Sequence, residues 1–307
     1  MYDAIIVGGG PAGLNAALVL GRAQRPTLLC DNDEARNRQV RVSHGFLSRD
    51  RIAPAELRAT AGEQLTPYPA VEARRVRVKR IEPQAASFRA TFGDGAAAEA
   101  RRVLLSTGVI DELPAIEGLA ARWGISAFNC PYCDGWEVRN QPLVAFGTDE
   151  ANIRLALTLT RYSPDVILCT NGAAEPDADH AGPLKQRGIA VRTEPIARLE
   201  GPGASLDRVV FGDGTAIHRT YAFTQAPARQ SSTIPDHLGL DRLEDGSIKV
   251  DDLGQTSVPG VFAAGDLARR PTMPLPGAQI AIAAAAGVIA AIALDQLLFM
   301  DEIAEGR

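Results

Sequence analysis

Apolar runs, a glycine-rich turn and a helical pattern follow one another at the start of the chain. Residues 3–7 are mostly apolar, which predicts a short buried strand, and they lead directly into Gly8-Gly9-Gly10-Pro11-Ala12-Gly13. Small and apolar residues then recur at helical spacing, at Leu14, Ala17, Leu18 and Gly21. A second apolar run, residues 27–30, ends at Asp31. This order predicts a βαβ unit whose helix begins at the glycine-rich turn.

The turn carries a complete G-x-G-x-x-G pattern at Gly8, Gly10 and Gly13. Between a strand and a helix, the first glycine makes the turn and the second lets backbone N–H groups approach a pyrophosphate. Asp31 lies 18 residues after Gly13 (31 − 13), where its carboxylate can accept hydrogen bonds from an adenosine ribose. The pattern therefore predicts a dinucleotide site, and a purely structural tight turn is the alternative.

A repeat in the sequence predicts a second unit of the same kind. The tetrapeptide Phe-Gly-Asp-Gly occurs at residues 92–95 and again at 211–214, and Asp-Gly between apolar runs predicts a hairpin. Ahead of the second copy, the apolar run 142–146 enters another turn at Gly147, followed by a helical segment. The chain is thus expected to hold two successive nucleotide-fold units, with residues 258–266 and the alanine-rich helix after them returning to the first.

Composition and charge exclude several classes of function. The 307 residues include 32 Lys and Arg against 37 Asp and Glu, so there is no basic excess of the kind that binds nucleic acid. The N-terminus has no basic region ahead of an apolar core and does not predict a signal peptide. Residues 278–294 are apolar but mostly alanine, with a central Gly287, which predicts a tightly packed core helix rather than a membrane span. We therefore expect a soluble, cytoplasmic protein.

Two cysteines at C-x-x-C spacing are the sharpest chemical signal. Cys130 and Cys133 can close a small redox-active disulfide, and Asp134 directly after them suits acid–base work during thiol exchange. Zinc would need two further ligands, but Cys30 and Cys169 are isolated at strand ends and the 4 histidines are scattered, so no metal is expected. Cys30 and Cys169 are expected to be small buried hydrophobes. Two structural thiols at positions 130 and 133 remain the alternative.

Taken together, these motifs resemble those of the thioredoxin-reductase-like flavoproteins, the low-molecular-weight branch of the FAD-dependent disulfide reductases. The matching segments are Gly8–Gly13, Ser106-Thr107-Gly108, Cys130-Pro131-Tyr132-Cys133-Asp134-Gly135, Phe262-Ala263-Ala264-Gly265-Asp266 and the helix near Gln279. The resemblance implies an α/β fold of two nucleotide-binding, Rossmann-like, three-layer domains, the second inserted into the first. It also implies a homodimer.

The resemblance gives each domain a range and a role. Residues 1–115 and 240–307 are expected to form the FAD-binding domain, and residues 116–239 the inserted domain with the C-x-x-C pair and a degenerate pyridine-nucleotide site. Gly265 and Asp266 would meet the ribityl and phosphate region of FAD, and the helix starting near Gln279 would point its positive end at the flavin. The residues expected to bind FAD are Gly8, Gly10, Pro11, Ala12, Gly13, Asp31, Arg36, Asn37, Thr107, Gly108, Gly265, Asp266 and Gln279.

The same resemblance assigns catalytic roles. Cys133 would be the sulfur that faces the flavin, Cys130 would exchange with the substrate, and Asp134 would supply the proton. The segment His44-Gly45-Phe46-Leu47 is similar to one in bacterial relatives of the dithiol oxidases. His44 is therefore a candidate proton shuttle, with a structural, hydrogen-bonded histidine as the alternative.

The second turn departs from the pattern of family members that use NADPH. It reads Gly147-Thr148-Asp149-Glu150-Ala151-Asn152, so Asp149 stands where a bare glycine should let a pyrophosphate approach the backbone. After the next strand, residues 165–169, the family's basic cluster for the 2′-phosphate is replaced by Thr170-Asn171-Gly172. We therefore expect NADPH not to be the ordinary partner; a degenerate but working site is the alternative.

These observations predict an FAD-dependent thiol–disulfide oxidoreductase that acts on a thioredoxin-like protein or on a small dithiol or disulfide. Similarity to the dithiol oxidases implies oxygen as the electron partner. Similarity to the pyridine-nucleotide-independent thioredoxin reductases implies ferredoxin or a second bound FAD, and a thioredoxin reductase with weakly bound NADPH is a further alternative. A flavin-binding redox sensor without turnover is the alternative from another class of protein.

Overall fold

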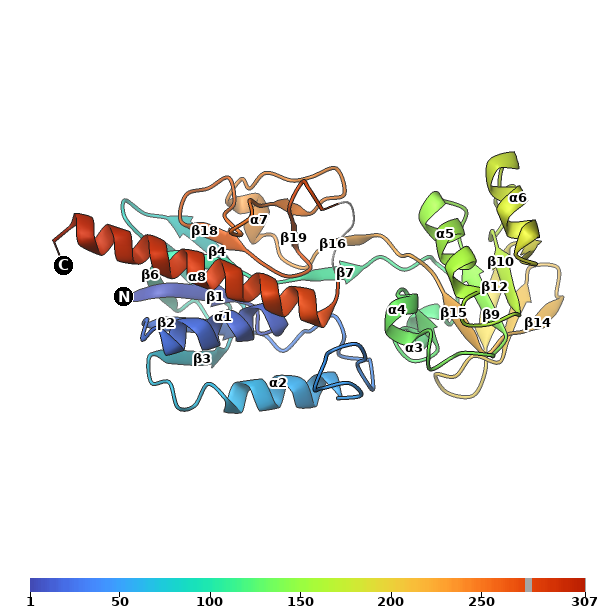
Figure 1. The fold of residues 1–307 in the computed structure, drawn as a ribbon, viewed down its shortest axis with the longest axis horizontal. Coiled ribbons are helices and arrows are strands. Elements are labelled where there is room, and N and C mark those ends of the chain that lie inside the picture. The colour runs from blue at the N-terminus through green and yellow to red at the C-terminus, as the bar shows by residue number, and fades with distance from the viewer. Residues whose placement is uncertain (274–277, 307) are drawn as a thin grey trace. The chain divides into compact units, whose positions relative to one another are not determined.

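The computed structural model describes residues 1–273 and 278–306, which fold into two compact units. Unit 1 is assembled from three segments, Met1–Arg38, Ala55–Ile110 and Ala228–Arg307. Unit 2 is assembled from two, Gln39–Pro54 and Asp111–Pro227. Both units are α/β (Figure 1). The predicted fold class is confirmed, since the main segment of unit 2 interrupts unit 1 in the chain.

The observed boundaries differ from the expected ones of 115/116 and 239/240. Helix α7, Ile234–His237, buries Ile234 in the hydrophobic core of unit 1, together with Leu238 and Leu240. This packing makes the segment from Ala228 onward part of unit 1. The segment Gln39–Pro54, expected within the FAD-binding domain, groups with unit 2 instead.

Unit 1 is built on a seven-stranded sheet in the order β3-β2-β1-β6-β5-β4, with β18 also paired to β6. Five of its strands run parallel: β1 (Tyr2–Val7), β2 (Thr27–Asp31), β3 (Val71–Arg75), β6 (Ala97–Leu105) and β18 (Val261–Ala263). The other two form an antiparallel ribbon beside β6: β4 (Val78–Pro83) and β5 (Phe88–Phe92). The predicted hairpin at residues 92–95 joins β5 to β6.

Alternate residues of β1 enter two different cores, as the pleat of a strand requires. Ile5 packs into a core on one face of the sheet, and Ile6 into the core on the other face, under α1 (Pro11–Arg22) and α8 (Ile280–Ala304). In the helix α2, Pro54–Glu63, Pro54 alone is buried, and the other residues are half-buried or exposed. Unit 1 therefore has the layered arrangement predicted for a nucleotide-binding fold.

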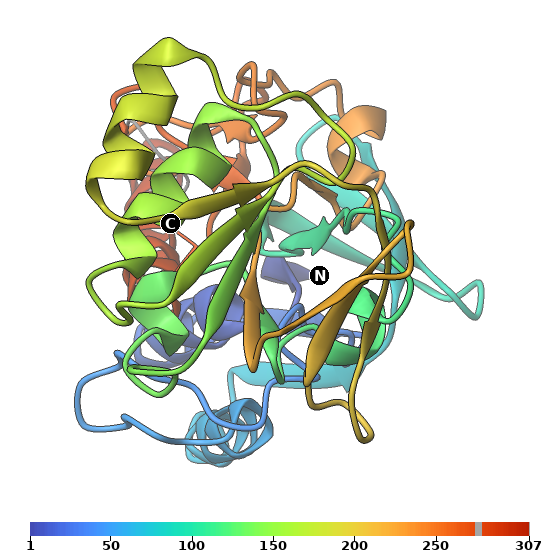
Figure 2. The ribbon, with the colours of Figure 1, turned by 90° about the vertical axis from the view of Figure 1, so that its right-hand side faces the viewer.

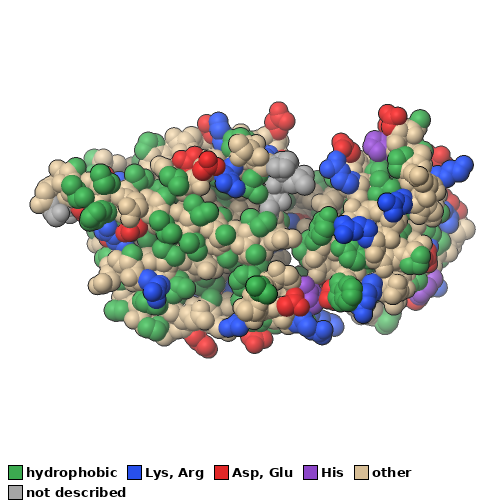
Figure 3. Space-filling view, in the orientation of Figure 1, with side chains coloured by type: hydrophobic (Ala, Val, Ile, Leu, Met, Phe, Trp, Pro, Cys, Tyr) green, Lys and Arg blue, Asp and Glu red, His purple; other side chains and the backbone are tan. Residues whose placement is uncertain are grey.

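The helix α8 packs against α1 with very little space between the two backbones. A Cβ atom at Gly287 would lie 2.1 Å from the carbonyl oxygen of Ala12, so only glycine allows this approach. By length and composition α8 could cross a membrane, but its close packing on α1 favours the predicted core helix. Its opposite face is exposed, and hydrophobic side chains are visible along it in Figure 3.

Unit 2 is built on a five-stranded parallel sheet in the order β11-β10-β9-β15-β8. Its strands are β8 (Ala127–Phe128), β9 (Leu143–Phe146), β10 (Val166–Cys169), β11 (Ala190–Arg192) and β15 (Tyr221–Phe223). A second, antiparallel sheet consists of β12 (Ile196–Glu200), β13 (Arg208–Phe211) and β14 (Ala216–His218). The predicted hairpin at residues 211–214 joins β13 to β14.

Two cores sandwich the parallel sheet of unit 2. Helices α5 (Glu150–Leu159) and α6 (Ala178–Gln186) cover one face, and the antiparallel strands cover the other (Figure 2). Two short helices flank the edge strand β8 in the chain: α3 (Leu119–Arg122) precedes it and α4 (Pro131–Asp134) follows it.

The chain passes between the units over two short paired strands, β7 (Val109–Asp111) and β16 (Ala228–Gln230). Within unit 1, β17 (Ile248–Lys249) pairs with β19 (Ala268–Arg269).

Candidate functional site

At the first and third glycines of the first glycine-rich turn, side chains would not fit. Gly8 follows β1 with a φ of +111°, and a Cβ there would lie 2.3 Å from the carbonyl oxygen of Ser106. A Cβ at Gly13 would lie 1.9 Å from the carbonyl oxygen of Gly8. Strand β1, helix α1 and the end of β6 therefore meet at a point that requires glycine.

The N-terminus of α1 is left open by its own side chains. Gly10 caps this helix without any side-chain hydrogen bond, and no heavy atom lies within 4 Å of the position its Cβ would take. Next to the turn, the hydroxyl of Thr107 is buried and has no partner among the described residues. An uncapped helix N-terminus beside an unpaired buried hydroxyl fits the pyrophosphate of a dinucleotide.

Other predicted FAD-binding residues lie around the same turn. Asp31 ends β2, and its Oδ1 accepts a hydrogen bond of 3.0 Å from the backbone N–H of Gly9. Arg36 Nη1 donates to Asp266 Oδ2 at 2.7 Å, which links the segment after β2 to the segment after β18. Gly265, with a φ of +89°, brings its Cβ position within 3.1 Å of the Ala12 side chain. These residues could hold the ribose and phosphate groups of FAD.

Three further predicted residues lie outside the strands and helices of unit 1 or cap one of them. Asn37 Oδ1 accepts a hydrogen bond of 3.4 Å from Arg58. Gly108 follows β6 with a φ of +69°, and its carbonyl oxygen accepts from the backbone of Ser231 at 3.2 Å. Gln279 caps α8 with no side-chain hydrogen bond, so the positive end of this 25-residue helix carries no side-chain cap.

The redox pair lies in unit 2 and is oxidised. Cys130 and Cys133 form a disulfide with Cα atoms 5.3 Å apart. Cys130 caps α4, Pro131 begins the helix, and the backbone N–H groups of Cys133 and Asp134 both donate to the Cys130 carbonyl oxygen at 3.2 Å. The helical turn therefore fixes the two sulfurs at bonding distance.

The remaining cysteines have a different environment. Cys30 and Cys169 are fully buried in the cores of units 1 and 2, and burial raises the pKa of each thiol to about 12. Because the thiolate is the reactive form, both are inert at neutral pH, as expected for small buried hydrophobes.

The carboxyl of Asp134 has a pKa close to neutral pH. Burial, followed by the nearby negative charge of Glu137, raises the pKa of its carboxyl from 3.8 to about 7. A group with a pKa close to the working pH can both give and take a proton efficiently. Glu137 was missed in the sequence analysis, although it lies only three residues after Asp134.

His44 lies on the segment that groups with unit 2. Its Nδ1 is 3.5 Å from Glu137 Oε1 and 3.6 Å from Asp50 Oδ1, and its side chain is 13% exposed. The backbone N–H of Gly45 donates to Asp50 at 2.9 Å and fixes the loop. His44, Glu137 and Asp134 thus form one titratable cluster beside the disulfide helix; the role of His44 as a proton shuttle stays a prediction.

The second glycine-containing turn differs from the first at its helix. Gly147 follows β9 with a φ of +117°, and its N–H donates to the Cys169 carbonyl oxygen at 3.1 Å. Asp149 caps α5, and its Oδ1 accepts from the backbone N–H of Asn152 at 3.0 Å. A carboxylate of the chain itself therefore occupies the anion-binding end of α5.

Among the described residues at the end of β10, the polar side chains are bound within the chain itself. The Thr170 hydroxyl donates to a backbone carbonyl at 2.6 Å, and Asn171 Oδ1 accepts from the Ile196 N–H at 2.8 Å. On the neighbouring strand, Arg192 donates to both carboxylate oxygens of Glu194, and this contact lowers the pKa of Glu194 to about 2. Arg192, a cation at this sheet edge, is thus already paired with a carboxylate of the chain.

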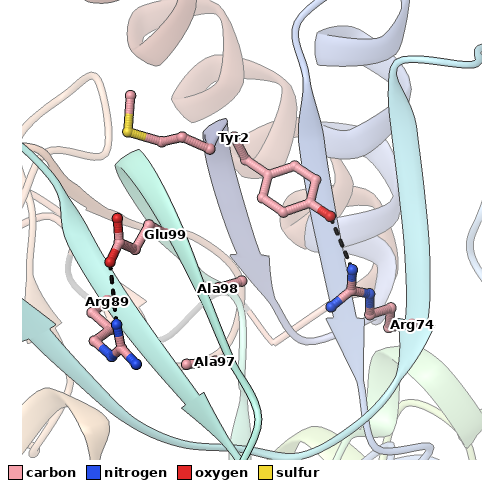
Figure 4. Close-up of a pocket in the computed structure, with 7 residues that line it drawn as sticks. Tyr2, Arg74, Arg89, Ala97, Ala98 and Glu99 are labelled. Carbon is pink, nitrogen blue, oxygen red and sulfur yellow. Dashed lines mark hydrogen bonds and ion pairs between the residues drawn. The ribbon is translucent and has the colours of Figure 1, made fainter.

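A cavity of about 330 Å³ opens elsewhere, on the surface of unit 1 (Figure 4). It is lined by Met1, Tyr2, Arg74, Arg89, Ala97, Ala98 and Glu99. Arg74 donates to the Tyr2 hydroxyl at 3.0 Å and Arg89 pairs with Glu99 at 3.2 Å, so its charged groups bind one another. None of the predicted site residues is among these. In the part of the chain that the structure describes, no group of three His, Cys, Asp or Glu side chains could hold a metal ion.

Comparison with known proteins agrees with this geometry. Residues 2–287 match the protein family described as "Pyridine nucleotide-disulphide oxidoreductase". Thioredoxin reductase tcpT of Claviceps purpurea is 34% identical over 287 residues, which are 87% of this chain and 86% of that protein. Thioredoxin reductase aclD of Aspergillus oryzae is 30% identical over 313 residues, 96% of this chain and 98% of that protein.

A solved structure, "the oxidoreductase from Agrobacterium tumefaciens", superposes with a TM-score of 0.90 at 36% identity, covering 97% of this chain and 99% of that one. The chain belongs to the pyridine nucleotide-disulphide oxidoreductase family. Within it, the chain is a thioredoxin-reductase-like, FAD-dependent disulfide oxidoreductase, as its motifs predicted.

Proposed function

We propose that this enzyme oxidises dithiols through the Cys130–Cys133 disulfide and FAD, without NADPH as its ordinary partner. One observation carries the proposal: the Asp149 carboxylate caps α5, where a nucleotide phosphate would have to bind, whereas Gly10 leaves α1 uncapped in the same chain. The first turn therefore leaves its helix N-terminus open to a phosphate, whereas the second turn blocks it with a carboxylate.

Electrostatics at the second turn oppose a phosphate. A helix N-terminus favours one negative charge by about 0.3–1 kcal/mol, and Asp149 already takes that position. A phosphate brought within about 4 Å of this carboxylate would be repelled by roughly 4 kcal/mol at an effective dielectric constant of 20. The repulsion exceeds what the helix dipole offers, and no basic side chain follows Cys169 to offset it.

The disulfide chemistry follows from the residues of unit 2. A substrate thiolate attacks the Cys130 sulfur, which breaks the Cys130–Cys133 bond, forms a mixed disulfide and releases Cys133 as a thiolate. Asp134, ionised in about half of the molecules at pH 7, takes the proton from the second substrate thiol. That thiol then attacks the substrate sulfur of the mixed disulfide, so Cys130 is released and the substrate leaves as a disulfide.

The substrate dithiol thereby loses two electrons, which the chain holds as the reduced cysteine pair. One substrate proton is lost when the attacking thiolate forms, and the other passes to Asp134, which can return it to a cysteine thiolate. When bound, FAD supplies a two-electron acceptor for this pair. The residues that would hold it are those around the first turn, with Asp31 toward the ribose and the α1 N-terminus toward the pyrophosphate. One FAD per chain is expected, because the second turn is capped.

The names of the relatives support a thioredoxin-like protein as one substrate, and similarity to the dithiol oxidases supports a small dithiol as the other. Oxygen is the acceptor we propose. Ferredoxin or a second flavin would instead require a further binding site, and a flavin content of about two per chain would favour that route.

The exposed face of α8 supports a homodimer formed through unit 1. Large apolar side chains that are 40–58% exposed line this face: Ile282, Ile289, Ile292, Phe299, Met300 and Ile303. Small residues such as Ala285 lie near its start and bulky ones such as Phe299 near its end. Both positions are 7 residues from Ile292, so antiparallel pairing of two copies about Ile292 sets large side chains against small ones.

The proposal is tested by turnover of the purified, FAD-loaded enzyme with dithiothreitol and with reduced thioredoxin, followed by oxygen uptake. We expect turnover with at least one dithiol and its loss in Cys133→Ser. Cys169→Ser is the matched control, since its thiol is buried and inert. Unchanged oxygen uptake in Cys133→Ser would contradict a catalytic disulfide and favour a flavin-binding redox sensor.

A further inference from the structure

The two turns occupy the same register in their units, which allows a residue-by-residue comparison. The first reads Gly8-x-Gly10-x-x-Gly13, and the second reads Gly147-x-Asp149-x-x-Asn152. Both the second and the third glycine positions are polar in unit 2. The sequence analysis treated the replacement at Asp149 but not the one at Asn152.

The two turns share two backbone features, although they differ at the third glycine position, where a Cβ at Gly13 would lie 1.9 Å from the Gly8 carbonyl oxygen. Each begins with a left-handed glycine, with φ of +111° at Gly8 and +117° at Gly147. In each, a hydroxyl from the end of the neighbouring strand donates to the carbonyl oxygen just before that glycine at 3.1 Å. Ser106 supplies this hydroxyl in unit 1 and Thr224 supplies it in unit 2. The two turns are therefore alike at the first glycine and differ at the third glycine position.

The Asn152 side chain lies between the second turn and the end of β15. Its side chain is buried, with 3% of the residue exposed. Its Nδ2 donates to Asp149 Oδ2 at 2.7 Å, and its Oδ1 accepts from the Gln225 backbone N–H at 2.7 Å. A Cβ atom at Gly147 would lie only 2.6 Å from this Nδ2. The carboxamide thus lies directly against the turn.

The Asn152 carboxamide lies beside the edge of the sheet where a nucleotide would be expected to bind. Strands β9 and β15 are neighbours, and the strand order reverses between them. The crevice at the carboxyl ends of two such strands is where open α/β sheets bind ligands. Asn152 connects the turn after β9 to Gln225 after β15, so it spans this crevice. In unit 1 the same position is Gly13, and the hydroxyl of Thr107 after β6 is buried without a partner among the described residues.

We infer that Asn152 is a specificity-determining residue that, together with Asp149, closes the nucleotide crevice of unit 2 from within. Its carboxamide satisfies the Gln225 N–H and holds the Asp149 carboxylate on the α5 N-terminus, where a pyrophosphate would have to bind. The excluded ligands are pyridine dinucleotides of either kind. This inference rests on the proposed function, because it gives the physical reason why NADPH is not the ordinary partner.

Binding of oxidised NADP⁺ and NAD⁺, which cannot reduce the flavin, tests this directly by isothermal titration calorimetry on the FAD-loaded protein. We expect no saturable binding to the wild type in the micromolar range. The double variant Asp149→Gly with Asn152→Ala restores the dinucleotide-binding motif G-x-G-x-x-A. It should bind both nucleotides at least tenfold more tightly than the wild type does. The gain should be equal for NADP⁺ and NAD⁺, because the end of β10 still lacks a site for the 2′-phosphate.

Asp177→Gly is the matched control. Asp177 caps α6 in the same unit, and its Oδ1 accepts from the His180 N–H at 3.1 Å, but α6 does not begin at the β9–β15 crevice. Removing this cap should create no nucleotide binding. If the double variant unfolds, the test uses Asn152→Ala alone, which keeps the Asp149 cap. We expect this variant to gain less nucleotide affinity than the double variant.

A folded variant that gains no affinity would overturn the inference, as would nucleotide binding by the wild type as tight as by the double variant. Failure of the proposed function has a different signature, namely fast flavin reduction by NADPH or dithiol turnover that does not need Cys133. The inference alone fails if the folded double variant gains nothing while the wild type still does not react with NADPH.

Discussion

Ionisation of Asp134 should control the rate at which the disulfide exchanges with a dithiol. The pKa of Asp134 is raised to about 7 from the ordinary 3.8, mainly by burial and then by Glu137. At a pKa of 7 the carboxyl is about nine-tenths protonated at pH 6 and about nine-tenths ionised at pH 8. Because the ionised form takes the substrate proton, the exchange rate should rise through this range.

The shift also predicts how stability depends on pH. A carboxyl whose pKa is raised by folding stabilises the folded protein fully below its unfolded pKa, and that contribution is lost as pH rises through its folded pKa. For Asp134 the window runs from 3.8 to about 7, and the loss is at most about 4 kcal/mol, at 1.36 kcal/mol per pKa unit. The Asn variant at this position should lack this slope.

Single-turnover exchange with dithiothreitol, measured by rapid mixing, tests the role of Asp134 in the exchange step. Asp134→Asn should slow the reaction by about 10²-fold or more and remove the inflection near neutral pH. Glu137→Gln should keep the inflection but move it to lower pH, since it removes a negative neighbour. Asp207→Asn, at an exposed carboxyl of unit 2, is the control and should keep the wild-type profile. A wild-type rate without an inflection between about pH 6 and 8 would refute the role of Asp134.

Three other outcomes follow from the structure. Cys133→Ser should abolish dithiol turnover and Cys169→Ser should leave it within about twofold, as measured by oxygen uptake; equal losses would contradict the assignment. Gly13→Ala should lose most of the bound FAD, as measured by flavin absorbance per protein, since its Cβ would lie 1.9 Å from a carbonyl oxygen. Ile292→Glu should convert the dimer to a monomer in light scattering, whereas Leu253→Glu, at another exposed apolar site of unit 1, should not; a monomeric wild type would exclude the dimer.

Local patterns were sufficient to predict most elements of the fold. The glycine spacing predicted the order β1, α1 and β2, and both Asp-Gly pairs predicted hairpins, because these signals depend on neighbouring residues. The boundary at Pro227 could not be predicted, because it depends on the packing of Ile234 into a distant core. For the same reason the grouping of Gln39–Pro54 with unit 2 has no local signal.

The apolar pattern of α8 predicts a helix but does not predict which of its faces is buried. Its composition predicted a helix packed tightly inside the protein, and the contact of Gly287 with α1 confirms the close packing. The large side chains such as Ile292 and Phe299 nevertheless line an exposed face. Apolar residues around a whole helix do not tell a core position from an interface.

The candidate site was predictable where a motif defined it and not where two segments meet. Cys130, Cys133 and Asp134 follow one another in a recognisable motif. Glu137 could not be identified from the motif, because its relevance comes from its effect on the pKa of Asp134 and from its contact with His44 on a distant segment. Asn152 had a usable signal, because it stands at the third glycine position of the second turn.

The measurement that tests the central claim most directly is anaerobic reduction of the bound flavin, followed by its visible absorption after rapid mixing. The account predicts that an excess of dithiol bleaches the flavin of the wild type and that NADPH at the same concentration does not. Rapid bleaching by micromolar NADPH, or none by any dithiol, would contradict it.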